Sequence, residues 1–348
     1  LTSLGGEAVQ TSIRMGTDGL GLIAFHFKNG ANHDLDVAHC ANQACTSATI
    51  TAIDTGGDVG EWPSLGIGAD GLGVISYRDI TNNRLKVAHC SNTACTSATT
   101  AVVDTAPGSD PFAEYTSLAI GTDGLPIVAY HDAGIDGILI VHCTAADCST
   151  TDTPVPFNDG GTYTSMQIGS DGLPVTAHAA GDERLTVGHC NDTGCVSGTV
   201  FFPDLNPITD ASLAIGFDGL PLVGYYETTG HTLNVVHCPN VRCEDSDAAV
   251  VIDSSSADVG TQGAITIGAD GQGLISYHDT ANDTLKVAHC IDRACSAATS
   301  YALSDGGTAT SITIGTDGFG LISFADASGA LAVVHCTSRE CTPHTRYR

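Results

Sequence analysis

Cysteine and histidine are the residues whose spacing in this chain could support chemistry. The dipeptide His-Cys occurs seven times, and each time a second cysteine follows five positions after the first. Two chemistries suit this pattern, namely seven local disulfides or seven metal sites made of thiolate and imidazole. The pairs, which account for all 14 cysteines, are Cys40 with Cys45, Cys90 with Cys95, Cys143 with Cys148, Cys190 with Cys195, Cys238 with Cys243, Cys290 with Cys295 and Cys336 with Cys341.

The surroundings expected for each pair favour disulfides. The four residues between the cysteines join two antiparallel strands, so the two α-carbons can come within bridging distance. Neighbours in a strand point to opposite faces, so His89 and Cys90 cannot easily chelate one ion. We therefore predict seven disulfides, an oxidising compartment and no metal at these pairs. The histidines are expected to be buried and to bond a loop backbone group or an acid of the neighbouring strand.

The elements that position these pairs form a repeated unit of about 50 residues. In residues 64–103, four short segments carry the alternation typical of strands, at 64–68, 73–77, 85–89 and 99–103. Asp70-Gly71 supplies the positive φ of a tight turn between the first two segments. The seven copies start near Ser12, Ser64, Ser117, Ser165, Ser212, Ala264 and Ser311.

Seven such units predict a single all-β domain over residues 1–348. We expect a seven-bladed β-propeller with four antiparallel strands per blade and one C-x4-C disulfide in each blade. The last unit lacks a fourth strand, because only a polar stretch follows Cys341. We expect the N-terminal segment, residues 1–4, to close the ring, with residues 344–347 as the alternative. Closure hides strand edges that would otherwise favour aggregation.

Residues 117–130 and 212–225 show the most regular form of the unit. Both begin Ser-Leu-x-Ile-Gly-x-Asp-Gly-Leu-Pro and end in tyrosine. This unit resembles the repeats of secreted bacterial seven-bladed β-propeller proteins, most of which have no assigned function. The resemblance covers essentially the whole chain and implies an exported protein: secreted, extracellular or on the cell surface, with the periplasm as the alternative. The unit lacks the Gly-His and Trp-Asp signatures of WD40 repeats and departs from the sialidase Asp-box.

The charge balance excludes several partners. Twelve basic residues oppose 39 acidic ones, which gives a formal net charge of −27. A nucleic-acid or anionic membrane surface needs clustered Lys and Arg, and the lysines are only Lys28, Lys86 and Lys286. No apolar run approaches the length of a membrane span. The chain begins with Leu1, which predicts a mature chain whose targeting segment has been removed.

Carboxylates recur where we expect the variable rim of the propeller. The regular Asp-Gly turns and cysteine loops share one rim, and the loops that differ between copies share the other, where binding residues usually concentrate. These carboxylates either cap loops and keep the chain soluble, or form an acidic mouth that attracts a cation or a basic partner. The acidic residues at the ends of the fourth strands are Asp54, Asp104, Asp159, Asp204, Asp253 and Asp305.

Calcium is the cofactor that the seven Asp-Gly turns suggest. Calcium needs several converging oxygens, and one Asp per turn supplies too few. The requirements of a tight turn already explain the dipeptide. We therefore predict no cofactor and no metal.

Aromatic residues stand at one position of three consecutive units. Trp62, Tyr115 and Tyr163 each lie two residues before the start of a first strand, and Glu61 and Glu114 precede two of them. They predict an arc that binds sugar or peptide. The alternative is that these side chains pack against the neighbouring blade.

Three functions fit these observations. The leading hypothesis is an extracellular, non-catalytic scaffold or binding module that recognises a protein or glycan through its variable rim and belongs to a surface assembly. The alternative is a hydrolase or lyase acting on polysaccharide at an acidic propeller mouth. A metal-binding protein is the weaker alternative. The chain carries no GxSxG, HExxH or P-loop motif, so we assign no catalytic residue and expect no enzyme.

Overall fold

The protein is built from antiparallel strands. A computed structural model describes the chain except residues 1, 31, 107–110, 245–247 and 343–348, and except the side chains of residues 6, 29, 32, 158 and 159. The described residues form strands and turns without a helix, so none offers a helix that could cross a membrane. The expectation of an all-β chain is confirmed.

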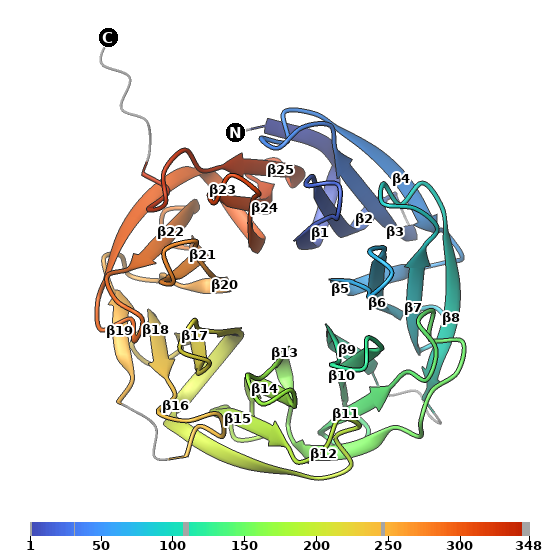
Figure 1. Cartoon of the computed structure of the whole chain (residues 1–348). Helices are drawn as coiled ribbons and strands as arrows, with labels where there is room; N and C mark the ends of the chain where they lie inside the picture. Colours follow the sequence, from blue (N-terminus) through green and yellow to red (C-terminus); the bar gives the residue numbers. More distant parts are fainter. Residues whose placement is uncertain (1, 31, 107–110, 245–247, 343–348) are drawn as a thin grey trace.

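Two repeat units form separate four-stranded sheets. In the second unit the order is β5 (Val59–Ile67), β6 (Gly73–Asp79), β7 (Arg84–Cys90) and β8 (Ala98–Thr105). In the third it is β9 (Phe112–Ile120), β10 (Pro126–Asp132), β11 (Gly137–His142) and β12 (Val155–Asp159). Figure 1 shows the sheets arranged around a central space, with the first strand of these units innermost and the fourth outermost.

The remaining units are joined through long strands. One sheet contains β13 (Thr162–Ile168), β14 (Pro174–Ala179), β15 (Arg184–Cys190), β16 (Gly198–Ile215), β17 (Pro221–Glu227), β18 (Thr232–His237) and β19 (Val250–Asp253). The other contains β20 (Thr261–Ile267), β21 (Gly273–Asp279), β22 (Thr284–Cys290), β23 (Ala298–Ile314), β24 (Gly320–Asp326), β25 (Ala330–His335), β1 (Thr2–Met15), β2 (Gly21–Asn29), β3 (Asn32–Cys40) and β4 (Ala48–Asp54).

Each long strand serves two successive units. The first half of β16 pairs with β15 and its second half with β17, and β23 is shared in the same way between β22 and β24. β1 pairs with β2 from Ala8 onward, and with β25 through Thr2, Ser3 and Glu7. The N-terminal segment therefore lies beside the last unit, as expected. The alternative closing segment, residues 344–347, falls outside the described residues.

Apolar side chains fill the space between neighbouring units. Leu85 and Val87 of β7 pack in one buried cluster with Leu118 of β9 and Tyr130 of β10. Burying each such side chain contributes about 1.5–3 kcal/mol. Every unit thus depends on the next for its core, which explains why the sequence repeats as a series rather than as independent domains.

A serine in the first strand also ties each unit to the next. Its hydroxyl accepts a hydrogen bond from a backbone N–H in the first strand of the following unit, and Ala264 is the exception among the seven positions. The last link runs from Ile13 N–H to Ser311, at 3.1 Å, and joins the last unit to the first. The other links are Ser12 to Leu65, Ser64 to Leu118, Ser117 to Met166, Ser165 to Leu213 and Ser212 to Ile265.

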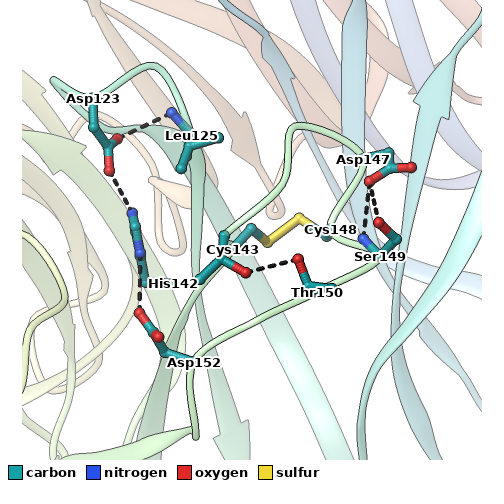
Figure 2. Close-up of a disulfide and its surroundings, with 10 residues drawn as sticks. Asp123, Leu125, His142, Cys143, Asp147, Cys148, Ser149, Thr150 and Asp152 are labelled. Carbon is teal, nitrogen blue, oxygen red and sulfur yellow. Dashed lines mark hydrogen bonds and ion pairs between the residues drawn. A yellow bond between two sulfur atoms is a disulfide. The ribbon is translucent and has the colours of Figure 1, made fainter.

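All seven predicted disulfides are present, so the disulfide interpretation of the cysteine pattern is confirmed. Their α-carbons lie 4.6 to 5.0 Å apart, within the range a disulfide requires. The bonds join Cys40 to Cys45, Cys90 to Cys95, Cys143 to Cys148, Cys190 to Cys195, Cys238 to Cys243, Cys290 to Cys295 and Cys336 to Cys341. Figure 2 shows the bond between Cys143 and Cys148 in the loop of the third unit.

The second cysteine of every pair has a backbone conformation that the spacing alone did not predict. Its φ is positive, between 49° and 59°, and its N–H bonds the carbonyl three residues earlier. This left-handed conformation is uncommon for a residue other than glycine. It appears in the same form at Cys45, Cys95, Cys148, Cys195, Cys243, Cys295 and Cys341.

In six units the histidine of the His-Cys pair hydrogen-bonds the aspartate of its own unit's Asp-Gly turn, and in the seventh unit His335 makes an ion-pair contact with Asp317. The distance from Nε2 to Oδ2 is 2.8 to 3.0 Å in all seven units, as seen for His142 and Asp123 in Figure 2. The other carboxylate oxygen accepts the N–H two residues further on, which is that of Leu125 in Figure 2. An acid was one of the two partners that the sequence predicted, although it lies in a turn and not on the neighbouring strand. Burial is only partly confirmed, since His39, His89, His237 and His335 are half-buried at the strand ends.

Candidate functional site

The centre of the candidate site is a ring of seven equivalent residues, here called the mouth ring. They are Gln10, Trp62, Tyr115, Tyr163, Asp210, Gln262 and Ala309, and all seven line one cavity of about 870 Å³. Each sits where the pairing of a first strand with its second strand changes register, as between Glu61 and Ser64. Such β-bulges re-aim a side chain, and here they aim seven of them at one cavity.

The backbone of the mouth ring is held in an uncommon conformation. Six of its members have φ between 50° and 56°, the left-handed region that non-glycine residues rarely adopt. Gly60, two residues before Trp62, also has a positive φ, and a Cβ there would meet the Leu35 Cα at 2.7 Å. Conformations of this kind cost about 1–3 kcal/mol each and cluster at functional sites.

The three predicted aromatic residues come together in one half of the mouth ring, here called the aromatic arc. The ring centroids of Trp62 and Tyr115 are 4.2 Å apart with a tilt of 40°, and those of Tyr115 and Tyr163 are 4.9 Å apart with a tilt of 46°. All three side chains are half-buried and line the cavity. They therefore pack on the neighbouring units, as the alternative interpretation of the sequence expected, and they also present a surface to the cavity. Binding of sugar or peptide by this arc stays a prediction.

The two predicted glutamates do not line the cavity. Glu61 and Glu114 both bind the guanidinium of Arg78, at 2.8 and 3.1 Å. Burial raises the pKa of Glu61, although the charge and hydrogen bond of Arg78 oppose this shift. The imidazole of His131, whose Nδ1 lies 3.6 Å from Glu114 Oε2, is the main cause that lowers the pKa of Glu114. Since adjacent strand residues face opposite sides, these glutamates anchor the strands that carry the aromatic arc.

The other half of the mouth ring is polar. Asp210, Gln262, Ala309 and Gln10 occupy it in succession, and we call this half the polar arc. Gln262 Oε1 accepts a hydrogen bond from the N–H of Ala309, and Gln10 Oε1 accepts one from the N–H of Trp62, at 3.1 Å. Polar side chains of the mouth ring thus hold the backbone of the next member.

Asp210 is the acidic member of the mouth ring. Burial raises its pKa, although the N–H of Gln262 and the hydroxyl of Thr209 stabilise the ionised form and oppose that shift. A carboxyl group with a raised pKa beside a cavity is suited to hold and deliver a proton. The position was visible in the sequence as the equivalent of Trp62, but nothing in the repeat pattern distinguished this aspartate from the many others.

Three further side chains able to exchange a proton line the same cavity, namely Tyr226, Asp258 and His278. The hydroxyl of Tyr226 donates a hydrogen bond to Asp258 Oδ1 at 2.6 Å. Among the described residues, the cavity lining therefore contains two carboxyl groups, Asp210 and Asp258. Burial and the hydrogen bond to Asp258 raise the pKa of Tyr226, and the charge of Asp210 raises it further. Sequence reasoning missed Tyr226 and Asp258, because they come from a second strand and a connecting loop that are far apart in the chain.

The fourth-strand carboxylates expected at an acidic mouth mostly bind other side chains. Asp54, Asp104, Asp204 and Asp253 each accept a hydrogen bond from a tyrosine of the next unit, at 2.6 Å for Tyr77 and Asp54. Lys86 and Lys286 also bind Asp54 and Asp253. Asp305 is exposed, and the side chain of Asp159 lies outside the described residues. None of the other five lines the cavity.

The lysine and tyrosine contacts of Asp54 and Asp253 lower the pKa of these two carboxyl groups. Burial alone would raise the pKa of Asp54, but hydrogen bonds from Lys86 and Tyr77 outweigh it, so the pKa is lowered. Asp253 follows the same pattern with Lys286, Ser255 and Tyr277. Their geometry suits a link between units better than a free acidic surface.

Comparison with known proteins supports the fold. No protein-family model matches the sequence, and no curated protein matches it. Solved structures do, among them an α-L-arabinanase of Penicillium chrysogenum complexed with arabinobiose, at 10% identity and a TM-score of 0.60, covering 96% of this chain and 98% of that one. A polysaccharide lyase acting as an ulvan lyase matches at 11% identity and a TM-score of 0.64, covering 96% and 94%.

A hydrazine synthase of Kuenenia stuttgartiensis matches at 10% identity and a TM-score of 0.67, covering 97% of both chains. Proteins with unrelated activities thus share this arrangement of strands. At these identities the similarity establishes a β-propeller type of fold and no activity.

Proposed function

We propose that the protein hydrolyses a neutral polysaccharide bound at the mouth ring. The observation that carries this proposal is the cavity of about 870 Å³, which has aromatic side chains along one half and a proton-holding carboxyl group, Asp210, in the other. This replaces the scaffold hypothesis as the leading one, because the carboxyl pair of the cavity offers chemistry that simple binding does not need.

The aromatic arc supplies the binding surface for sugar rings. Trp62, Tyr115 and Tyr163 form a continuous series of rings, with centroids no more than 4.9 Å apart between neighbours. The apolar face of a sugar stacks on an aromatic ring, while its hydroxyl groups need polar partners. Gln10, Asp210 and Gln262 supply such partners across the cavity.

Asp210 and Asp258 supply the two carboxyl groups of glycoside hydrolysis. Asp210, whose pKa is raised by burial, donates its proton to the glycosidic oxygen as the bond to the anomeric carbon breaks. Asp258, held by Tyr226 at 2.6 Å, serves as the partner that activates water or attacks the anomeric carbon. The hydroxyl of water ends on the anomeric carbon. If Asp258 activates the water, Asp258 takes its proton, which returns to Asp210 through solvent; if Asp258 attacks the carbon, Asp210 takes the proton directly as water cleaves the sugar–Asp258 ester.

A neutral substrate fits the charges better than an acidic one. The described residues that line the cavity include no lysine and no arginine. Arg78 does not line the cavity and is bound by two glutamates. With a net charge of −27, the chain repels uronate or sulfate groups. Elimination by a lyase needs stabilisation of a substrate carboxylate, so hydrolysis is favoured over the lyase alternative.

The test is turnover of neutral polysaccharides, measured as new reducing ends and confirmed by mass spectrometry of the products. We expect activity on at least one neutral glycan and its loss in Asp210→Asn. The matched control is Asp305→Asn, which makes the same change at an exposed position outside the cavity lining and should keep full activity. Turnover that survives Asp210→Asn would contradict the proposal.

A non-catalytic glycan-binding module is the second candidate. The aromatic arc favours it, because three stacked aromatic side chains can retain a glycan without any chemistry. Binding of oligosaccharides without product, lost on Trp62→Ala, would establish this candidate over the hydrolase.

The setting of the site is part of the proposal. We propose a seven-bladed propeller closed by residues 2–7, supported by the β1–β25 pairing and by the Ile13–Ser311 bond. We also propose that it works outside the cell, supported by seven disulfides, which persist in oxidising surroundings.

A further inference from the structure

Three metal-ligating side chains converge at the junction of the first and second units. His26 lies on β2, His33 on β3, and Asp58 in the loop before β5. Asp58 Oδ1 is 3.2 Å from His33 Nδ1 and 3.7 Å from His26 Nε2. The two imidazole rings meet edge to face with centroids 4.6 Å apart, and all three ligand atoms lie within 4.8 Å of one another.

His26 points into this cluster without a hydrogen-bond partner. It is 2% exposed, and neither of its ring nitrogens bonds any of the described residues. Buried polar atoms normally have a partner, so a buried imidazole with two free nitrogens calls for one. The side chains of His33 and Asp58 are 26% and 32% exposed, which gives an ion a path to the cluster.

In the fifth unit, the residues at the three equivalent positions are joined by hydrogen bonds. Tyr226 pairs with Leu233 as His26 pairs with Leu35, His231 stands at the start of the next strand, and Asp258 precedes Val-Gly as Asp58 does. There the tyrosine hydroxyl lies 2.6 Å from both His231 Nδ1 and Asp258 Oδ1. It bridges the histidine and the carboxylate.

In the first unit, histidine replaces that tyrosine, and the bridging hydroxyl is lost. The gap between His33 and Asp58 is instead faced by a third group able to ligate a metal, His26. A cation in the gap would contact all three groups, as the hydroxyl contacts two in the fifth unit. With histidine in place of tyrosine, a hydrogen-bonded contact between two units becomes a group of three possible metal ligands.

We propose that His26, His33 and Asp58 bind one divalent transition-metal ion. Two imidazole nitrogens with one carboxylate suit zinc and its neighbours rather than calcium or magnesium, which prefer oxygen ligands. Ligand bonds of about 2.0–2.1 Å require donors no more than about 4.2 Å apart, which a small side-chain rotation provides. Three protein ligands leave one position for water or for a ligand from outside.

The site is separate from the proposed glycan site. None of its three residues lines the mouth-ring cavity. It also differs from the seven His-Cys pairs, whose cysteines are all in disulfides. The ion would join the β2–β3 hairpin of one unit to the loop that leads into the next.

The test compares the full-length protein with a variant copied from its own fifth unit. Metal is removed with a chelator, Zn²⁺ is added in excess, free ion is removed by dialysis, and bound zinc is measured by elemental analysis. We expect about one Zn²⁺ per chain in the wild type and none above background in His26→Tyr. Tyrosine is tolerated at this position in the fifth unit, so folding should survive and is checked by circular dichroism.

Two further variants make the result specific. His33→Ala removes a ligand and should also abolish binding, whereas His231→Ala, at the equivalent place in the fifth unit, should leave the zinc content unchanged. Replacing Zn²⁺ with Co²⁺ should give ligand-field absorption in the wild type and not in His26→Tyr. The proposal is overturned if the wild type retains no zinc, or if His26→Tyr retains as much as the wild type.

Discussion

The two rims of this molecule differ in how strictly their residues repeat. One rim, here called the disulfide rim, carries the Asp-Gly turns and the disulfide loops, and the other carries the mouth ring. On the disulfide rim, all seven units carry the same histidine, aspartate and bridged loop, with Nε2–Oδ2 distances of 2.8 to 3.0 Å. At the mouth ring, seven equivalent bulges carry five residue types. Residues that repeat in every unit stabilise the fold, and residues that differ between units determine which side chains line the cavity.

The same contrast divides the mouth ring itself. The aromatic arc offers apolar faces, and the polar arc offers a carboxyl group, amides and a small side chain. A cavity with one apolar half and one polar half can orient a sugar chain, which has both kinds of surface. The two halves therefore separate binding from chemistry, and variants in each should have different effects.

The largest expected effect is at Asp210. Asp210→Asn keeps the shape but cannot donate a carboxylic proton, so turnover of a neutral polysaccharide should fall by about 10²–10⁴-fold. Burial raises the pKa of this group, and its protonated form is the active one. Wild-type turnover should therefore decline as pH rises through that raised pKa, measured as initial rates across pH. A pH profile without a basic-side decline would argue against Asp210 as the acid.

The disulfide rim should respond in stability and not in activity. Replacing Cys90 and Cys95 together by serine removes one small loop closure and should lower the free energy of unfolding by about 2 kcal/mol. Denaturant unfolding measures this change, and turnover in native buffer should stay unchanged. A loss of turnover in the folded variant would show that the two rims are not independent.

The aromatic arc should respond in affinity. Trp62→Ala removes the ring that stacks on Tyr115, and oligosaccharide binding should weaken by about 3–10-fold, as expected for one aromatic contact. Calorimetry on the catalytically dead Asp210→Asn background isolates binding from turnover. Equal affinity with and without the tryptophan ring would remove the aromatic arc from the site.

The smallest expected effect concerns the serine hydroxyl that links each unit to the next. Ala264 is the position where the serine that links successive units is missing. Ala264→Ser provides a hydroxyl acceptor for the N–H of Ile312 and should raise the free energy of unfolding by about 0.5–1 kcal/mol. The reverse change at an equivalent position, Ser212→Ala, should lower it by a similar amount, since it removes the bond to Ile265. A lower free energy of unfolding in Ala264→Ser would show that a serine at this position does not stabilise the contact between the sixth and seventh units.

Much of the frame was predictable from the sequence, because identical local needs recur in every unit. The cysteine spacing identified the disulfides, and Asp-Gly identified the turns with their left-handed glycines, such as Gly71. The partner of each histidine was predicted only as an acid or a loop group. Nothing local indicated that the turn aspartate folds back to a histidine about 20 residues later, as Asp123 does to His142.

The site was predictable only where it depends on position within the repeat. Aligning the units predicted that Trp62, Tyr115 and Tyr163 lie together, because equivalent positions of successive units are neighbours in space. The cluster of His26, His33 and Asp58 was missed, since its members come from three elements of two units and share no local pattern. The same holds for Tyr226 and Asp258.

The most direct test of the account is glycan binding by the wild type and by Trp62→Ala on the same array of neutral oligosaccharides. The wild type should bind at least one neutral glycan and Trp62→Ala should bind it about 3–10-fold more weakly, while the folded variant with serine at positions 90 and 95 keeps the wild-type affinity. Wild-type protein that binds no neutral glycan, or a Trp62→Ala variant that binds as well as the wild type, would contradict the claim that the mouth ring is the functional site.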